Sequence, residues 1–478
     1  MTSDRASTAS AYAAALSLLA PIVWASPSAA AAKPTPRPSV VVIVADDLGY
    51  ADVGADGAKA FPTPHIDRLA REGIRFTDGY ATASVCSPSR AGFHTGRYQA
   101  RFGQDFNPAL RETPEVSLPT SETTLAQRAR SQGYVTGLIG KWHLGTQAGY
   151  HPMDRGYDEY FGFASSAVYL PALAPGDGRY LVPGERERAQ RRQGFMRGRQ
   201  ALEEGGFLTD IVTREAVDFI GRHAADPFFL VVTHHAPHVP IEAPAAVMQR
   251  VAAIEDPALR TYAAMILSLD DSVGAILRAL ETHGRDRDTL VVFFSDNGCP
   301  EYLRGTCSNG EVSGFKRDLR EGGVRIPMFW RWPGTLPAGR TVATPITTLD
   351  AMVSALSVTG ADLGAAPRLD GRDLLPALRA GGSPTAVPLF WRAGDNLVVR
   401  DGRWKLWQAK RPEGGRVDLL FDLIADPGEQ RNLAAAKPDE VSRLSGLLQD
   451  FQRGNVPPRW EPRRDVVDIA GQRIELAF

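Results

Sequence analysis

Short apolar runs rich in β-branched residues alternate along the chain with longer segments in which apolar positions recur every three or four residues. The first pattern predicts buried strands, and the second predicts helices that bury one face. The expected strands are Val40–Ala45, Tyr134–Ile139, Phe228–Thr233, Leu290–Ser295 and Ile326–Trp330. The expected helices are Pro64–Glu72, Thr124–Gln132, Asp210–His223 and Pro257–Thr282. This alternation predicts an α/β fold with a large, mostly parallel sheet sandwiched by helices.

The pattern changes in the last hundred residues. The expected elements there are strands at Leu397–Arg400, Arg403–Trp407 and Leu419–Asp422 and an amphipathic helix at Pro438–Phe451. Asp401-Gly402 lies between the first two strands and readily adopts the positive φ angles of a tight hairpin turn. We therefore expect a catalytic domain over residues 33–383 and a smaller C-terminal α+β subdomain, with a small antiparallel sheet and a helix, over residues 384–478.

Residues 1–32 have the features of an export signal. A polar start containing Arg5 precedes the apolar run Ala11–Ala25, and the small residues Ser28–Ala32 offer a cleavage site. The run is shorter than the ~20 residues that span a bilayer. We predict a signal peptide and an exported protein, periplasmic or secreted; a disordered alanine-rich tail is the alternative. No later segment predicts a membrane span.

The charge of the chain is nearly balanced, with 54 basic and 55 acidic residues and a formal net charge of -1. Proteins that bind nucleic acid usually carry a basic excess, so this class is not expected. Any attraction for an anionic ligand must therefore come from a local group of charges.

Paired oxygen ligands follow two of the expected strands. Asp46-Asp47 comes directly after one, and Asp296-Asn297 follows another. Ligands gather beyond the carboxyl ends of the strands in such folds, and four oxygen donors there suit Ca²⁺ or Mg²⁺ better than zinc. The alternative for each pair is capping of a turn or helix.

Candidate cationic groups follow other strands. Lys141 and His143 are two residues apart, so in an extended segment they face the same side. His238 lies between two prolines that stiffen its loop, and Lys316 precedes a glycine-rich segment. Each alone is typical of solvated surface, but together around a metal they would form a pocket for a tetrahedral oxyanion. His234 and His235 are expected to be structural.

The chain has three cysteines, an odd number for an exported protein. Cys299 and Cys307 are close enough in sequence to form a disulfide in an oxidising compartment. That pairing would leave Cys86 as a free thiol, for which a buried inert side chain is the alternative.

The segment Cys86–Arg90 (Cys-Ser-Pro-Ser-Arg), followed by Gly92, Thr95 and Gly96, resembles the signature of the sulfatase family, in which the cysteine is oxidised to formylglycine. His94 departs from the signature, which usually has an aliphatic residue there. Further blocks in family order are Val44–Gly49, Thr63–Asp67, Gly140–Gly145, Phe294–Gly298 and Leu420–Leu433. The resemblance spans about Ser39 to Leu433 and implies an alkaline-phosphatase-like fold.

The resemblance also implies a set of roles. The implied metal ligands are Asp46, Asp47, Asp296, Asn297 and the modified Cys86, and the implied ion is Ca²⁺, with Mg²⁺ open. Arg90 would fix the hydrated aldehyde, Lys141 and Lys316 would bind sulfate, and His143 would assist breakdown of the intermediate. His238 would protonate the leaving alcohol, and Asp296 would take the proton of the attacking hydroxyl. The implied partners are the formylglycine-generating machinery and a sulfate ester, expected to be a saccharide.

Two other functions remain open at this point. A phosphodiester or phosphonate monoester hydrolase on the same fold can also use formylglycine. A non-catalytic protein that binds sulfated glycans is the second alternative. Residues 164–206 have weak periodicity and are expected to be an insertion, and its six arginines and two glutamates at Glu185–Gln200 indicate either solvated surface or a contact for a polyanionic saccharide.

Overall fold

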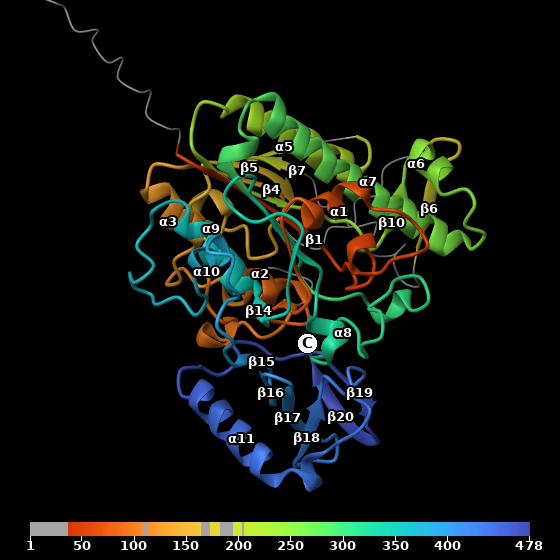
Figure 1. Cartoon of the computed structure of the whole chain (residues 1–478), viewed down its shortest axis with the longest axis vertical. Helices are drawn as coiled ribbons and strands as arrows, with labels where there is room; N and C mark the ends of the chain where they lie inside the picture. The colour runs from red at the N-terminus through yellow and green to blue at the C-terminus, as the bar shows by residue number, and fades with distance from the viewer. Residues whose placement is uncertain (1–36, 109–112, 164–172, 182–194, 203–204) are drawn as a thin grey trace, which may run out of the picture. The chain divides into compact units, whose positions relative to one another are not determined.

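A ten-stranded sheet is the centre of the fold, and its five middle strands are parallel. The computed structural model describes residues 37–108, 113–163, 173–181, 195–202 and 205–478 (Figure 1). The strand order is β13 (Arg340–Val342), β2 (Ile74–Phe76), β12 (Met328–Arg331), β11 (Thr289–Ser295), β1 (Ser39–Ala45), β9 (Phe228–Thr233), β4 (Val135–Lys141), β5 (Glu159–Phe163), β7 (Phe195–Arg197) and β8 (Gln200–Leu202). The predicted α/β fold is confirmed.

Helices cover both faces of this sheet because the central strands are apolar on both sides. Val41 and Ile43 of β1 belong to one core cluster, and Val42 and Val44 belong to the other. The first face is covered by α1 (Pro64–Arg71), α5 (Leu208–Arg222) and α7 (Pro257–Thr282). The second face is covered by α2 (Cys86–Thr95), α3 (Leu125–Ser131), α9 (Thr348–Ser357) and α10 (Leu375–Arg379).

The register of the central strands decides where the polar segments meet. Ala45, at the end of β1, pairs with Ser295 at the end of β11, and Val44 pairs with Thr233 at the end of β9. The residues that follow these three strands therefore emerge at one edge of the sheet, although the strands end at Ala45, Thr233 and Ser295, far apart in the sequence. This edge is where the candidate site is built.

A second, four-stranded antiparallel sheet follows toward the C-terminus (Figure 1). Its strands are β15 (Leu389–Ala393), β16 (Asn396–Asp401), β17 (Trp404–Lys410) and β18 (Arg416–Asp422), and the last helix is α11 (Pro438–Gln452). Leu444 and Leu448 of α11 pack on one face of this sheet, and Ile474 of the hairpin β19 (Arg464–Ile469)–β20 (Gln472–Ala477) packs on the other. These elements match the expected small sheet and helix, whereas the domain boundary at residue 384 stays a prediction.

Several elements were not predicted. They include α2, α9, α10, β2, β5 and the β19–β20 hairpin, together with α6 (Ala245–Arg250), α8 (Glu321–Val324) and the short pairs β3 (Gly79–Tyr80)–β14 (Ile346–Thr347) and β6 (Gly178–Tyr180)–β10 (Ile241–Ala243). The expected strand Ile326–Trp330 is present as β12, but it runs antiparallel to β11. The five middle strands are therefore parallel, β12 interrupts this order by pairing antiparallel with β11 and β2, and the edge pair β13–β2 is again parallel.

The expected insertion at residues 164–206 is described only in part. Its β7 and β8 form an antiparallel edge of the main sheet. Arg197 pairs with Glu215 at 2.8 Å and Arg199 with Asp154 at 2.6 Å, so these two arginines are already neutralised. The other four arginines of the segment, and the predicted signal peptide at residues 1–32, lie outside the described residues. None of the described helices combines the length and apolar character needed to span a bilayer.

Candidate active site

The four predicted oxygen ligands converge at the edge of the sheet. Asp46 and Asp47 follow β1, Asp296 and Asn297 follow β11, and all four side chains are fully buried. The Asp47 N–H donates to Asp296 Oδ1 at 3.3 Å, and Asn297 Nδ2 donates to Asp47 Oδ1 at 2.7 Å. The predicted meeting of the two pairs is therefore observed.

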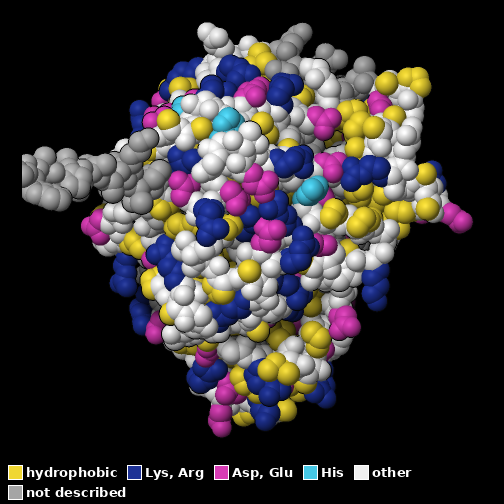
Figure 2. Space-filling model, turned by 45° about the horizontal axis from the view of Figure 1, so that its top comes forward, with side chains coloured by type: hydrophobic (Ala, Val, Ile, Leu, Met, Phe, Trp, Pro, Cys, Tyr) yellow, Lys and Arg dark blue, Asp and Glu magenta, His cyan; other side chains and the backbone are white. Residues whose placement is uncertain are grey.

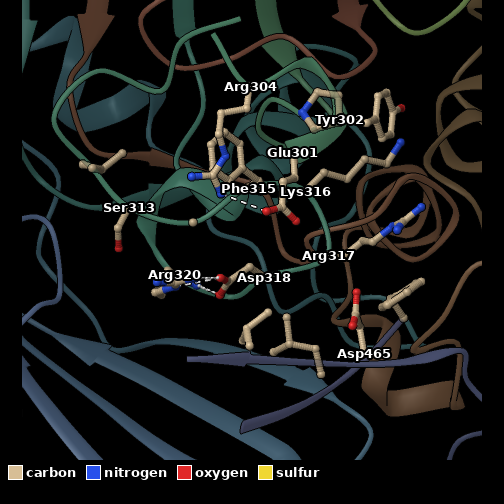
Figure 3. A pocket seen from close by; sticks show the side chains of 16 residues that line it. Glu301, Tyr302, Arg304, Ser313, Phe315, Lys316, Arg317, Asp318, Arg320 and Asp465 are labelled. Carbon is tan, nitrogen blue, oxygen red and sulfur yellow. Dashed lines mark hydrogen bonds and ion pairs between the residues drawn. The ribbon is translucent and has the colours of Figure 1, made fainter. Parts of the chain in front are cut away.

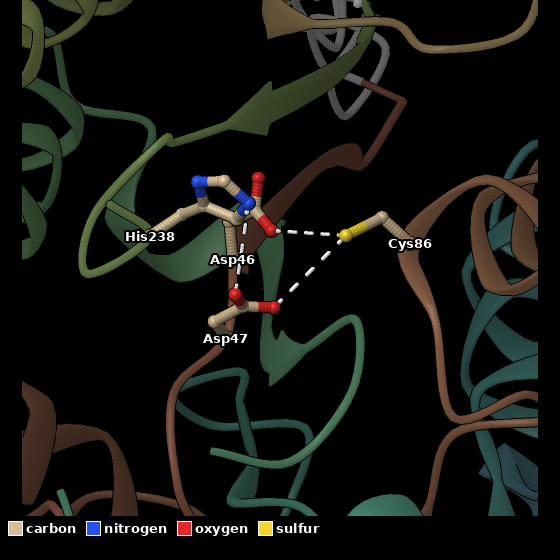
Figure 4. A group of neighbouring side chains, drawn as sticks. All are labelled: Asp46, Asp47, Cys86 and His238. Carbon is tan, nitrogen blue, oxygen red and sulfur yellow. Dashed lines mark hydrogen bonds and ion pairs between the residues drawn. The ribbon is translucent and has the colours of Figure 1, made fainter. Parts of the chain in front are cut away.

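Cys86 is the first residue of α2, and its thiol faces the two carboxylates that follow β1 (Figure 4). Its Sγ lies 3.4 Å from Asp46 Oδ1 and 4.0 Å from Asp47 Oδ1. Burial, together with the charges of Asp296 and Asp46, raises the pKa of the thiol. Cys299 and Cys307 form the disulfide that the sequence allowed, so Cys86 is the free cysteine of the chain.

Arg90 lies one turn further along α2 and is fully buried. Its guanidinium donates to Asp296 Oδ2 at 3.0 Å and to the Lys141 carbonyl at 3.0 Å, and it lies 3.5 Å from Asp46. One cation thus joins the end of β11, the end of β4 and the helix that carries Cys86. This position fits the predicted role of balancing the carboxylates.

Two buried lysines complete the charge balance. Lys141 Nζ lies 2.5 Å from Asp46 Oδ2, and Lys316 Nζ lies 2.7 Å from Asp47 Oδ1 and 3.2 Å from Cys86 Sγ. Burial would raise the pKa of Asp46, but the neighbouring cations, Lys141 foremost, hold it well below its usual value. Burial would lower the pKa of Lys316, but Asp47 raises it well above its usual value. The group is therefore a set of fixed charges sheltered from water.

These charges are local, as expected from the balanced composition. On the face shown in Figure 2, basic and acidic side chains are interspersed. No large basic surface is visible on this face. An anionic ligand at the site would meet the buried cations Arg90, Lys141 and Lys316.

The geometry around His143 differs from the prediction. The residue has a φ of +64°, so the segment is not extended there, and the argument from a two-residue spacing was wrong. Its backbone carbonyl accepts a hydrogen bond from Ser87 Oγ at 3.0 Å, while its Nδ1 is buried and has no partner among the described residues. Burial, helped by the positive charges of Lys141 and Arg90, lowers the pKa of His143 well below its usual value, against the opposing charge of Asp46. His143 therefore joins the site through a turn instead of a strand.

His238 reaches the site from the loop after β9 (Figure 4). Its Nε2 lies 3.7 Å from Asp47 Oδ2, and its Nδ1 lies 2.7 Å from the Val239 carbonyl. A carbonyl only accepts, so Nδ1 carries the proton in the neutral ring, and Nε2 is then an acceptor. Burial, against the opposing charge of Asp47, lowers the pKa of His238 to about 4.

The two other histidines of this loop differ from each other. His234 Nε2 lies 3.1 Å from Ser272 Oγ of α7, so His234 is structural as predicted. His235 is also buried, but its ring centroid is 4.9 Å from that of His238. It therefore packs beside a site residue, which the sequence did not indicate.

Strained backbone concentrates around the buried charged group that contains Cys86. The described non-glycine residues with positive φ include Asp47 at +67°, His143 at +64° and Arg317 at +81°. Such conformations cost free energy and cluster at functional sites in proteins. The strain fits a site that is held in place by the surrounding fold.

The donor set fits a divalent cation. Ligand atoms of Asp46, Asp47, Cys86 and His238 lie within 4.8 Å of one another. His238 was not predicted as a metal ligand, and the predicted ligand Asp296 does not belong to this group. Asn297 Oδ1 is a buried oxygen with no hydrogen-bond partner among the described residues. Hard carboxylate and amide oxygens are the ligands that Ca²⁺ and Mg²⁺ prefer.

Two features of the site were missed from the sequence. Tyr302 donates its hydroxyl to Asp47 Oδ2 at 3.3 Å, and no motif marks it. Helix α2 was missed although Pro88 lies in its first turn and Gly96, with a φ of +70°, ends it. Both are known helix signals, and the helix places Cys86 where the N-terminal dipole favours negative charge.

A family model described as Sulfatase matches residues 38–361. The chain belongs to the sulfatase family. This sulfatase is 32% identical to the steryl-sulfatase of Mus musculus, over 87% of this chain and 81% of that protein. It is 32% identical to the N-acetylgalactosamine-6-sulfatase of Canis lupus familiaris, over 92% of this chain and 90% of the relative.

The sulfatase is also similar to a solved structure, that of Ps i-CgsB in complex with k-i-k-neocarrahexaose. The TM-score is 0.78 at 30% identity, and the match covers 89% of this chain and 94% of that chain. The family and these relatives make the protein a sulfuric ester hydrolase, so a phosphonate hydrolase or a non-catalytic glycan-binding protein is not favoured.

His94, the departure from the sulfatase signature, is accommodated by its surroundings. It lies in α2 with its ring buried against Trp142, and its Nδ1 lies 2.9 Å from Tyr157 Oη. The side chain is thus buried against aromatic residues of the core.

Proposed function

We propose that this sulfatase hydrolyses sulfate esters through a formylglycine at position 86, with Ca²⁺ as its metal. The proposal is carried by one observation: Cys86 begins α2 directly opposite the buried carboxylates of Asp46 and Asp47, with Lys316 Nζ 3.2 Å from its Sγ. When present, the hydrated aldehyde and the dication supply an ionised hydroxyl that attacks sulfur.

The metal would be held by Asp46, Asp47, Asp296 and Asn297, together with modified residue 86. His238 is a candidate for a further contact, because its Nε2 is an acceptor in the neutral ring. Arg90 would hold the hydrated side chain of residue 86 and keep Asp296 ionised, since it contacts that carboxylate directly. Asp296 would accept the proton that the attacking hydroxyl loses.

The lysines would bind the sulfate group. Lys316 is better placed than Lys141, because it contacts both Asp47 and Cys86, whereas the contacts of Lys141 are to Asp46. With a metal held by the carboxylates, the ammonium groups of Lys141 and Lys316, which contact Asp46 and Asp47 in this structure, would be available to donate to sulfate oxygens. His143 would assist release of sulfate through its unpartnered Nδ1.

Replacement of His238 by alanine should slow substrates with poor leaving groups more than those with good ones. If His238 protonates the departing oxygen, alkyl and saccharide sulfates lose about 10²–10⁴-fold in kcat, whereas an aryl sulfate with an acidic phenol loses much less. The measurement is kcat for a series of sulfates of graded leaving-group pKa. An equal loss across the series would show that His238 acts otherwise, for example as a metal ligand. His234→Ala, on the same loop but bonded to Ser272, controls for misfolding.

The substrate class that we propose is a sulfated saccharide. One similar structure holds k-i-k-neocarrahexaose, and one relative is named for a sugar sulfate. A pocket of about 280 Å³ adjoins Lys316 and Tyr302 (Figure 3). Aromatic faces and charged groups suited to sugar hydroxyls line it, among them Tyr302, Arg304, Arg317, Asp465 and Phe478.

Asp465→Ala tests this pocket. Its carboxylate lies across the pocket from Glu301, and its loss should raise KM for sulfated saccharides about 10-fold, since a charged hydrogen-bond acceptor is removed. A small aryl sulfate should be unaffected. Asp468→Ala is the matched control, because Asp468 lies on the same hairpin and bonds only its turn at Gly471. Equal kinetics of the Asp465 variant and the wild type on saccharides would exclude the pocket as the saccharide site.

We also propose that residues 1–32 are a signal peptide and that the protein is exported after cleavage. The composition of this segment supports the proposal, and N-terminal sequencing of protein recovered from the host's periplasm or medium would test it. An intact N-terminus on exported, active protein would contradict it.

The proposed function is tested by comparing aryl sulfates with aryl phosphodiesters at matched concentration. We expect released sulfate to dominate. Higher kcat/KM for the phosphodiester by a large factor would overturn the assignment of sulfate as the physiological ester.

A further inference from the structure

The loop at residues 316–325, called here the lysine loop, is bonded through its backbone to two other segments of the site. One is the segment just before Cys86, and the other is the segment just after Asn297. The hydrogen bonds are Lys316 N to Cys299 O at 2.8 Å, Arg317 N to Ser84 O at 2.8 Å and Gly298 N to Gly323 O at 3.0 Å. The position of this loop therefore decides where Lys316 lies relative to the nucleophile and the metal ligands.

The loop packs too closely to adjust independently. A Cβ on Gly323 would lie 1.9 Å from the Asp318 carbonyl oxygen, and one on Gly298 would lie 1.9 Å from that of Gly322. Glycine is therefore required at these backbone contacts. A displacement at one end of the loop would be passed to the other end, because close-packed segments shift together.

The C-terminal sheet holds this loop through a buried charged group. Glu429 Oε2 accepts the backbone N–H of Glu321, at the start of α8, at 2.6 Å. Lys405 of β17 lies between the two carboxylates, 2.9 Å from Glu321 Oε1 and 3.1 Å from Glu429 Oε1. All three side chains are at most 1% exposed, so water does not weaken these contacts.

The turn that presents Glu429 explains a sequence block that the proposed chemistry does not use. Within Leu420–Leu433, Asp426 accepts the backbone N–H groups of Gln430 and Arg431, and Asn432 accepts that of Leu420. Glu429 itself has a φ of +53°. The acidic and amide residues of this block therefore fix a strained turn, from which the fully buried carboxylate of Glu429 reaches the lysine loop.

We propose that Glu429 is a positioning residue for sulfate binding: by holding the lysine loop at Glu321, it fixes Lys316 beside residue 86. This inference rests on the proposed function, because Lys316 is taken to bind the sulfate group. The block around Glu429 thereby links the C-terminal sheet to the active site.

A double-mutant cycle between Glu429 and Lys316 tests the proposal. Glu429→Ala should lower kcat/KM for an aryl sulfate about 10–100-fold, as expected for a small misplacement of a binding group. In a Lys316→Ala background the same change should cost less than about threefold, because its effect passes through Lys316. The inhibition constant for inorganic sulfate should rise in parallel. Glu429→Gln should recover most of the activity, since its amide oxygen can accept the Glu321 N–H.

The controls separate positioning from general stability. Leu448→Ala opens a cavity under α11 and should lower Tm while leaving kcat/KM within about twofold of wild type. If Glu429→Ala does not fold, Asp426→Ala takes its place in the cycle, because the half-buried Asp426 carboxylate accepts two backbone N–H groups of the turn. The expected loss in kcat/KM is then a few-fold. Equal losses with and without Lys316, or wild-type activity in the folded variant, would overturn the proposal. A wild-type protein that releases no sulfate would instead refute the proposed function.

Discussion

Cys86→Ala should abolish turnover, lowering sulfate release by about 10⁴-fold or more, because the group that attacks sulfur is removed. Cys86→Ser should be equally inactive in steady state for a different reason. A serine can attack once, but its sulfate ester lacks the second hydroxyl whose proton loss would expel sulfate. At most one equivalent of alcohol per protein is therefore expected, with no free sulfate. Burst kinetics and the mass of the peptide containing residue 86 check both expectations.

The same mass measurement on wild-type protein tests whether Cys86 is converted to formylglycine. Ser87→Ala is the matched control for perturbation of α2, since Ser87 bonds the His143 carbonyl next to the nucleophile. It should retain modification and most activity. A fully active preparation with an unaltered thiol at position 86 would contradict the proposed mechanism.

The central sheet and its two faces could be predicted because each middle strand is a continuous apolar run. Helix α2 could not be predicted in this way, because all its residues are buried, so no solvent-exposed face makes polar and apolar residues alternate with a helical period. Helix α9 was missed for a similar reason, because all of its residues except Ser357 are buried. Periodicity reveals an element only when water lies on one side of it.

The sequence indicated which residues belong to the candidate site, but not how their side chains are arranged in space. The strand ends placed Asp46 and Asp296 together only on the assumption that β1 and β11 are neighbours, which the register confirms. His143 joins the site through a left-handed backbone that no spacing argument anticipates. The contact of Glu429 with Glu321 crosses 108 positions, and only the folded chain shows it.

Removal of the metal should have the second large effect. The described carboxylates of Asp46, Asp47 and Asp296 meet within one buried cluster, whose counter-charges are Lys141, Lys316 and Arg90. When the dication is removed by a chelator, Lys141 and Lys316 remain paired with these carboxylates. They are then not available to bind the sulfate group of the substrate. We expect activity to fall by at least about 10³-fold and to return when Ca²⁺ is restored, with Mg²⁺ less effective because it demands stricter octahedral geometry.

The Tm of the protein should also rise with Ca²⁺ concentration, since an ion that binds only the folded state stabilises that state. Asp47→Asn should weaken this Ca²⁺-dependent rise, because a carboxylate at the centre of the cluster is lost. Asp52→Asn is the matched control: Asp52 is also buried near β1, but it bonds Tyr262 and backbone N–H groups outside the cluster. Its Ca²⁺ response should equal that of the wild type. An equal loss of response in both variants would mean that the cation acts elsewhere, and full activity in chelator would refute a metal at this site.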